Sequence, residues 1–162
     1  MSPDLRIIKE FCEALKIAAE QGFNKLGVLT HAWHESGAFR KVIGNHGYWG
    51  IKKPKVWKGK VVLVDTHEYI DGKRVPVKAP FIDFDSANDA IIWYCGFIRR
   101  LYPEAYYKRD NPMEYFIGLM NGVMTKQGPL QYATDPNYPT KLTSLYRILQ
   151  QDSNIKFLIE KV

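Results

Sequence analysis

The chain has 162 residues, of which 46% are hydrophobic and 14% aromatic, enough for one compact domain with a hydrophobic core. This composition argues against a disordered chain, and no apolar run approaches the ~20 residues that a membrane-spanning helix needs. Lysine and arginine total 23 against 17 aspartate and glutamate, and the resulting charge of +6 favours an anionic partner. Nucleic acid, anionic lipid and an anionic wall polymer all fit that charge.

Helical patterns dominate the N-terminal part of the chain. The helix predicted over residues 4–21 ends at Gly22, and its apolar face consists of Leu5, Ile8, Cys12, Leu15 and Ala19. A second helix is predicted over residues 24–36, with core positions at Leu26, Leu29 and Trp33. The segment 38–59 is rich in glycine and is expected to be a loop.

A β-hairpin is expected to follow this loop. Residues 60–70 and 74–84 are predicted to form two strands around the turn residues Asp71-Gly72. Pro76 and Pro80 make the second strand an edge strand or an irregular one.

Three helix-start signals follow. Ser86-Ala-Asn-Asp89 resembles a capping box and opens a helix that ends before Pro103. Asn111-Pro112 begins a helix that reaches about Asn121, and Asp135-Pro136 begins one that runs through about Leu149. A short helix over about 153–160 ends the chain. We therefore predict a single, mainly α domain over residues 1–162, with one inserted hairpin at about 60–84.

Cys12 and Cys95 lie among apolar residues of predicted helices, which favours buried free thiols over a disulfide. No metal-type cysteine spacing is present. The N-terminal residues Met-Ser-Pro-Asp-Leu-Arg lack the pattern of a signal peptide. We expect either a protein that reaches an external substrate by other means, or an excised domain of a larger secreted enzyme.

Two glutamates are candidates for acid chemistry. Glu35 lies near the end of an apolar helix that Gly37 should terminate, with Val28 and Ala32 on its face, so desolvation should raise the pKa of its carboxyl group. Glu68 shares one face of the first predicted strand with β-branched residues. Hydrolysis of a glycosidic bond commonly needs two such carboxyl groups.

Each glutamate also has a simpler interpretation. Glu35 fits an exposed residue near a helix end, and Glu68 fits a cross-strand ion pair with Lys73 or Arg74. The carboxylates that compete with these two are Asp65, Asp83 and Asp85.

Two further clusters of polar and charged residues stand out. His31, His34 and Glu35 do not follow the spacing of the zinc-binding helix motifs, so we expect no metal, and the two histidines should flank a groove or cap polar surface. The run Lys52–Lys60 mixes lysines with Trp57, which fits a solvated loop, attraction to anionic wall polymers, or a nucleic-acid surface.

From about Gly27 to Leu149 the chain resembles the N-acetylglucosaminidase family of bacterial autolysins, flagellar wall hydrolases and phage lysins. The matching blocks are His-Glu-Ser-Gly at 34–37, Trp-Gly-Ile-Lys at 49–52, Trp-Lys-Gly-Lys at 57–60, Thr-His-Glu-Tyr at 66–69 with Asp-Gly-Lys at 71–73, Phe-Ile-Asp-Phe-Asp-Ser at 81–86, and Tyr-Ala-Thr-Asp-Pro-Asn-Tyr at 132–138 followed by Lys141-Leu142. The chain departs from the family pattern at Ala38-Phe39, where the family often has Trp-Gly, and at His46-Gly47-Tyr48, where it usually has Asn-Asn-Leu.

The resemblance implies a lysozyme-like α+β fold, with a helical lobe, a small β-hairpin lobe and a groove between them. It implies cleavage of the β-1,4 bond after N-acetylglucosamine in peptidoglycan, with Glu35 as the acid and Glu68 as the second carboxylate. The residues expected to line the groove are Tyr132, favoured over Tyr138, together with Tyr48 and Trp49, for which packing between the lobes is the alternative.

The expected partner is therefore the peptidoglycan glycan strand, without cofactor, nucleic acid or membrane insertion, acted on by a monomer. Such an enzyme would act as a phage lysin that passes from host cytoplasm to cell wall, or as a virion-associated hydrolase. The rival functions are a muramidase or a lytic transglycosylase on the same fold, and a non-catalytic wall-binding or virion structural domain.

Overall fold

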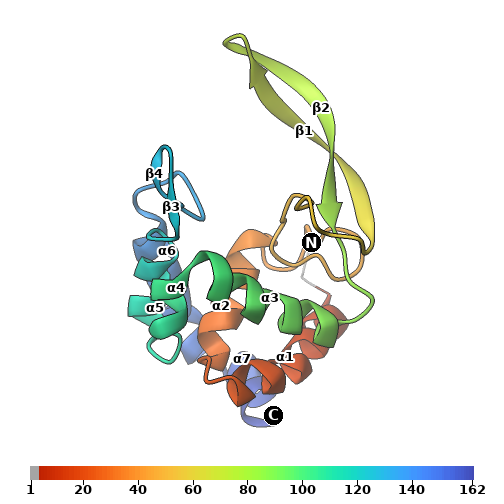
Figure 1. Ribbon diagram of the computed structural model, residues 1–162. Coiled ribbons are helices and arrows are strands. Elements are labelled where there is room, and N and C mark those ends of the chain that lie inside the picture. The colour runs from red at the N-terminus through yellow and green to blue at the C-terminus, as the bar shows by residue number, and fades with distance from the viewer. Residues whose placement is uncertain (1–3) are drawn as a thin grey trace.

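A helical body carries two β-hairpins of very different length in this computed structural model, which describes residues 4–162 (Figure 1). The elements in chain order are α1 (Leu5–Glu20), α2 (Lys25–Glu35), β1 (Val61–Ile70), β2 (Lys73–Ile82), α3 (Ala87–Leu101), α4 (Pro103–Tyr107), α5 (Pro112–Gly118), β3 (Met124–Thr125), β4 (Gly128–Pro129), α6 (Tyr138–Gln151) and α7 (Ser153–Glu160). The predicted mixture of many helices with an inserted hairpin is confirmed. The expectation drawn from the N-terminal residues rests partly on residues 1–3, which lie outside the described range.

The first two helices begin where the sequence places their caps. The Asp4 side chain accepts a hydrogen bond from the Arg6 backbone N–H at 2.9 Å, and the Asn24 side chain accepts one from the Gly27 N–H at 2.8 Å. Most of the predicted apolar face of α1 is buried, but Leu5, the first residue of the helix, is 71% exposed. Ala19 is also exposed.

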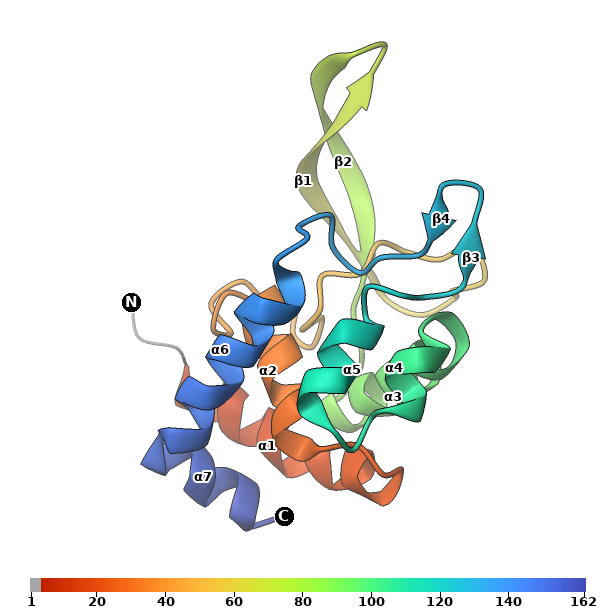
Figure 2. The same cartoon turned by 90° about the vertical axis from the view of Figure 1, so that its left-hand side faces the viewer.

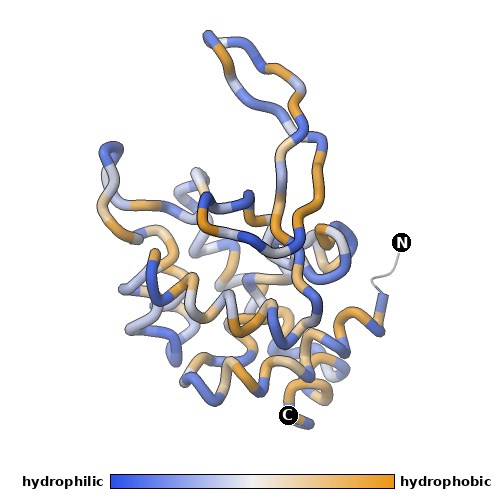
Figure 3. The backbone as a smooth tube through the Cα atoms, turned by 45° about the vertical axis from the view of Figure 1, so that its right-hand side comes forward, coloured by the Kyte–Doolittle hydropathy of each residue, from blue (hydrophilic) through white to orange (hydrophobic). Residues whose placement is uncertain are grey.

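The long hairpin confirms the predicted turn. β1 pairs antiparallel with β2 from Val61↔Ile82 to Ile70↔Lys73. Asp71 and Gly72 have φ values of 51° and 76°, as a two-residue hairpin turn of the right twist requires. Figures 1 and 2 show the pair standing away from the helical body, and Figure 3 shows its apolar residues concentrated near the base.

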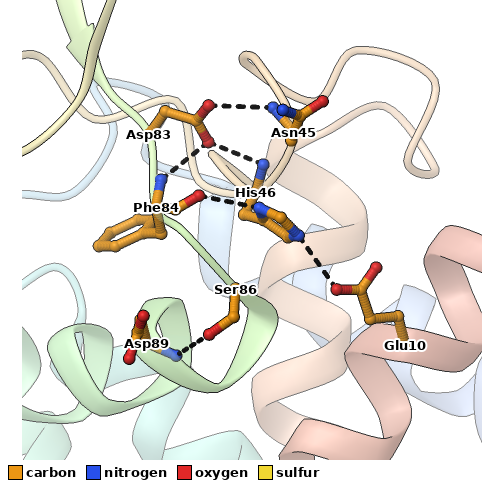
Figure 4. A network of polar contacts seen from close by, with 7 residues as sticks. All are labelled: Glu10, Asn45, His46, Asp83, Phe84, Ser86 and Asp89. Atoms are coloured by element: carbon orange, nitrogen blue, oxygen red, sulfur yellow. Dashed lines mark hydrogen bonds and ion pairs between the residues drawn. The ribbon is translucent and has the colours of Figure 1, made fainter.

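A buried carboxylate fastens the base of this hairpin to the body (Figure 4). Asp83, 5% exposed, accepts hydrogen bonds from the backbone N–H groups of Asn45 (3.1 Å), His46 (2.8 Å) and Phe84 (2.8 Å). The His46 ring contacts the Phe84 carbonyl oxygen at 2.8 Å and the Glu10 carboxylate on α1 at 3.0 Å. The loop, the end of β2 and α1 are therefore held by one polar network.

The C-terminal half follows the predicted helices with three corrections. The Ser86 hydroxyl accepts from the Asp89 N–H at 3.0 Å and begins α3 as expected. Pro103 ends α3 but also opens α4, because proline suits the first turn of a helix. This short helix was not predicted. The helix that begins at Asn111-Pro112 ends at Gly118, earlier than the expected Asn121.

The third correction concerns the start of α6. It begins at Tyr138 and not directly after Asp135-Pro136, because the Asp135 side chain accepts from the Asn137 N–H at 2.8 Å and closes a turn instead. The short β3–β4 hairpin was not predicted either; each of its strands has only two residues, too few to show alternation.

The core lies between the helices and is rich in aromatic rings. Cys12 and Cys95 are buried free thiols in it, as predicted. Over residues 4–162, none of the helices combines the length and apolar character that crossing a bilayer requires.

Replacing Asp83 with alanine should destabilise the protein by about 3 kcal/mol, because three backbone N–H groups would lose a charged acceptor in a buried site. Urea unfolding measures this change. The matched control is Asp65→Ala on the hairpin, where the carboxylate is 86% exposed, and its effect should stay within about 0.5 kcal/mol. Equal effects of the two substitutions would contradict the role assigned to Asp83.

Candidate active site

Glu35 is the last residue of α2, and a tight turn follows it. The Ser36 hydroxyl donates to the Ala32 carbonyl oxygen at 2.7 Å and accepts from the Phe39 N–H at 2.9 Å. Gly37, Ala38 and Phe39 all have φ values near +60°, a left-handed conformation that costs about 1 kcal/mol or more for a residue with a side chain. The chain therefore accepts local strain where α2 ends, as functional sites often do.

The environment of Glu35 has the character predicted from the sequence. Val28 and Ala32 on the same face are buried, and Glu35 itself is half-buried. Burial raises the pKa of its carboxyl group, while a hydrogen bond from Tyr138 and the nearby His34 oppose that rise without cancelling it. A carboxyl group in this position can hold a proton closer to neutral pH than an ordinary glutamate.

Tyr138, the first residue of α6, makes the contact with Glu35. Its hydroxyl donates to Glu35 Oε1, and its ring is 2% exposed. Tyr132, the favoured tyrosine, makes no hydrogen bond to Glu35: its hydroxyl donates to the Trp49 carbonyl oxygen at 3.4 Å, and its ring centroid is 6.2 Å from that of Tyr138. Tyr132 keeps partial exposure, so its role in lining a groove stays a prediction.

His31 corrects another expectation. It neither flanks a groove nor caps polar surface, but is fully buried one turn before Glu35. Its Nδ1 contacts the Tyr94 hydroxyl at 2.6 Å and its Nε2 contacts the Tyr138 hydroxyl at 2.9 Å. Within residues 4–162, no three His, Cys, Asp or Glu side chains gather in a way that could hold a metal ion.

The expectation that Tyr48 and Trp49 form groove walls is wrong for this conformation. They are 0% and 2% exposed. Tyr48 packs edge-on against Phe11 with ring centroids 4.8 Å apart, and Trp49 stacks on Tyr94 at 4.1 Å. Residues of α1 and α3 pack against them, so both rings belong to the core of the helical body.

Glu68 lies far out on the hairpin. It is the eighth residue of β1, so it stands about 23 Å along the strand from Val61 at a rise of ~3.3 Å per residue. Its carboxylate is exposed and pairs at 3.5 Å with Lys52, not with Lys73 or Arg74 as the simpler interpretation had it. The structure does not bring Glu68 into contact with Glu35.

The competing carboxylates have other partners. Asp83 holds the backbone of the loop, Asp85 pairs with Lys60 at 2.8 Å, and Asp65 pairs with Lys78 at 3.7 Å. Of these, Asp65 and Asp85 are exposed. None of the three contacts the residues around Glu35.

The basic run Lys52–Lys60 forms an exposed loop in which Trp57 packs against the body. The Trp57 ring packs against Trp93 and Phe84, with centroids 5.9 and 5.4 Å apart, and its indole N–H donates to the Lys60 carbonyl oxygen at 2.9 Å. The lysines of this run are exposed. Trp57 therefore serves local packing.

Two tyrosines behind His31 were not predicted as part of the site. Tyr94 on α3 and Tyr115 on α5 are fully buried, and their hydroxyls contact each other. Both looked like ordinary apolar positions of amphipathic helices, and no spacing in the sequence connects them with Glu35.

Comparison with known proteins agrees with the motif resemblance. The sequence profile of the glucosaminidase family, described as mannosyl-glycoprotein endo-beta-N-acetylglucosaminidase, matches residues 12–151. The peptidoglycan hydrolase FlgJ of Salmonella typhimurium is 31% identical over 170 aligned residues, covering 95% of this chain and 48% of that protein. The chain thus spans about half the length of the curated relatives it matches.

Solved structures show the same fold. A C-terminally truncated glycoside hydrolase domain of Salmonella typhimurium FlgJ superposes with a TM-score of 0.69 at 28% identity, covering 91% of this chain and 98% of that one. A peptidoglycan hydrolase mutant from Sphingomonas sp. A1 has a TM-score of 0.69 at 22% identity, covering 97% and 99% of the two chains, and this second likeness shows the fold alone.

The raised pKa of Glu35 predicts a pH-dependent cost in stability. The folded state holds the Glu35 proton more tightly than the unfolded state, so stability falls as pH rises from about 4.5 through the folded pKa. Glu35→Gln keeps an acceptor for Tyr138 and removes the charge. The variant should match the parent below pH 4 and be more stable at pH 8, as measured by urea unfolding at both values.

The control for this measurement is Glu13→Gln, an exposed acid on α1 that should change stability by only about 0.3 kcal/mol at pH 8. A Glu35→Gln protein that is less stable than the parent at pH 8 would refute the desolvation argument.

Proposed function

The chain belongs to the glucosaminidase family, and on that premise we propose that it hydrolyses peptidoglycan at the β-1,4 bond after N-acetylglucosamine, with Glu35 as general acid. The observation that carries the proposal is the half-buried Glu35 carboxyl group, whose pKa burial raises and whose Oε1 is held by Tyr138. Such a group can protonate the glycosidic oxygen as the bond breaks, the step that glycosidases need from an acid.

Glu68 is the proposed second carboxylate. It either activates water for an inverting reaction, which requires carboxyl groups about 6.5–9.5 Å apart, or stabilises an intermediate formed by the substrate's own 2-acetamido group. Either role requires the hairpin to bend toward the body when substrate binds. Two features favour such a bend: β1 and β2 form a two-stranded sheet of their own, and the exposed Glu68–Lys52 pair is worth at most about 1 kcal/mol.

The substrate is proposed to lie across the end of α2. Figures 1 and 2 show that α2 leads toward the side from which both hairpins rise. Tyr132 and Tyr138 would contact the sugar from this side, and the net charge of +6 suits an anionic wall polymer. We propose that the protein acts at the cell wall as a monomer, without insertion into a membrane.

Glu35→Gln should lower kcat on purified peptidoglycan by about 10²–10⁴-fold, because the amide cannot donate the proton. Glu68→Gln should lower it by at least about 10-fold, because one carboxylate role is lost. Borohydride reduction of the products should label N-acetylglucosamine ends. The matched control is Asp65→Asn on the opposite face of β1, which should keep full activity.

Reducible muramic ends would reassign the enzyme as a muramidase, and anhydro ends would make it a lytic transglycosylase. Binding to sacculi without any release of reducing ends would favour a non-catalytic wall-binding or virion structural domain.

Hairpin bending can be measured with spin labels at Asp71→Cys on the hairpin and Gln127→Cys on the β3–β4 turn. The native Cys12 and Cys95 are buried, and burial raises the pKa of both thiols to about 12, so they should not react. Adding glycan strands to the Glu35→Gln protein should shorten the label distance by about 11 Å, the arc that a ~20° bend gives at the tip of a strand pair about 33 Å long.

A second label pair, at Gln127 and Gln150 on the body, should keep its distance. If the first pair also keeps its distance with glycan bound, Glu68 does not reach the bond that is cut.

A further inference from the structure

A buried chain of hydrogen bonds runs from α5 to Glu35. It passes from the Tyr115 hydroxyl to the Tyr94 hydroxyl, then to His31 Nδ1 at 2.6 Å, and from His31 Nε2 to the Tyr138 hydroxyl at 2.9 Å, which donates to Glu35 Oε1. Four helices contribute to it: α5, α3, α2 and α6. Its three internal members, Tyr94, His31 and Tyr138, are each no more than 2% exposed.

The direction of donation in this chain follows from its two ends. An ionised Glu35 can only accept, so the Tyr138 hydroxyl must donate to it and must in turn accept from His31 Nε2–H. At the other end, Tyr94 is the single hydrogen-bond partner of the Tyr115 hydroxyl within residues 4–162. Reversing the chain of hydrogen bonds would leave the Tyr115 hydroxyl hydrogen without a hydrogen-bond acceptor among residues 4–162.

The side chains in this row of hydrogen bonds are in the protonation states that donation from Tyr115 toward Glu35 requires. Burial lowers the pKa of His31 to about 3, with His34 adding to the effect, so the ring is neutral and has one N–H. Burial also raises the pKa of Tyr94, Tyr115 and Tyr138, so these hydroxyls stay protonated. A neutral His31 that accepts from Tyr94 at Nδ1 must carry its hydrogen on Nε2.

We propose that His31 is a positioning residue that, through Tyr138, commits Glu35 Oε1 to accepting a hydrogen bond and so directs the catalytic proton to Oε2. This inference deepens the proposed function and rests on it for the identity of the acid.

The physical reason lies in the two oxygens of Glu35. When the carboxyl group takes up a proton, Oε1 already accepts from Tyr138, and Tyr138 cannot accept from Glu35 because it accepts from His31. The proton is therefore held on Oε2, the oxygen free to meet a glycosidic oxygen. The other groups that face this region are His34 on α2, Tyr132 in the loop before α6, and Asp135, which faces His34.

The first test reads the His31 ring directly and needs no turnover. Nitrogen-15 NMR of the parent protein should show His31 as the Nε2–H tautomer throughout pH 5–8, with no titration. The Nδ1–H tautomer, or a ring that takes up a proton in this range, would overturn the proposal.

The second test uses two substitutions with opposite expectations. Glutamine at position 31 can donate to Tyr138 and accept from Tyr94, so His31→Gln should keep kcat within about 3-fold of the parent. His31→Leu removes the donor, and it should lower kcat about 10-fold with little change in KM, because the Glu35 proton can then turn toward Tyr138. The high-pH limb of its kcat/KM profile should also move to higher pH, because Tyr138 then donates less strongly to the ionised carboxylate.

Tyr115→Phe is the matched control for lost buried hydrogen bonding. It removes a hydroxyl from the far end of the chain of hydrogen bonds and leaves Tyr94 able to donate to His31, so it should lower stability without moving the pH profile.

A folded His31→Leu protein with parental kcat and pH profile would refute the proposal. If that variant does not fold, a His31→Gln protein with much reduced kcat would refute it instead. A parent protein that shows the Nε2–H tautomer but never cleaves peptidoglycan would refute the proposed function and leave the hydrogen-bond chain standing.

Discussion

The contact between the last residue of α2 and the first residue of α6 is the interaction on which the site depends. Glu35 and Tyr138 are 103 positions apart in the sequence, and their side chains meet in a half-buried place where a charged carboxylate is costly. Burial raises the pKa of the Glu35 carboxyl group, and the hydrogen bond from the Tyr138 hydroxyl lowers it. These opposing effects set how tightly the Glu35 carboxyl group holds a proton, and both of them come from helix packing.

Much of this arrangement can be predicted from local patterns. Asn24, Ser86 and Asn111 each cap a helix with their own side chains, and Asp71-Gly72 supports only one kind of turn, so the positions of α2, α3, α5 and the long hairpin follow from a few residues. The low polarity around Glu35 also follows locally, since Val28 and Ala32 belong to the same helix.

The features that could not be predicted depend on contacts between distant segments. Whether Tyr132 or Tyr138 faces Glu35 depends on where α6 begins, and the Asp135 turn moves that start by two residues. Tyr48 and Trp49 have the composition of a sugar-binding surface, yet α1 and α3 cover them. In sequence, His31 resembles a surface or ligand residue, and only the position of Tyr94 on another helix makes it part of the core.

Glu35 and Glu68 are held by different kinds of structure, and this difference bears on the proposed mechanism. Glu35 is fixed by a turn, by Tyr138 and by an aromatic core, so its proton can be placed before any substrate arrives. Glu68 sits on a strand pair whose firm attachment ends at its base, where Asp83 binds the loop backbone. In the proposed mechanism a long glycan strand enters between the lobes, and a second carboxylate fixed in place would narrow that entrance. We propose that a rigid acid combined with a movable partner lets the glycan strand bind first. The carboxylate of Glu68 then comes into place after water has been displaced, when its electrostatic effect is largest.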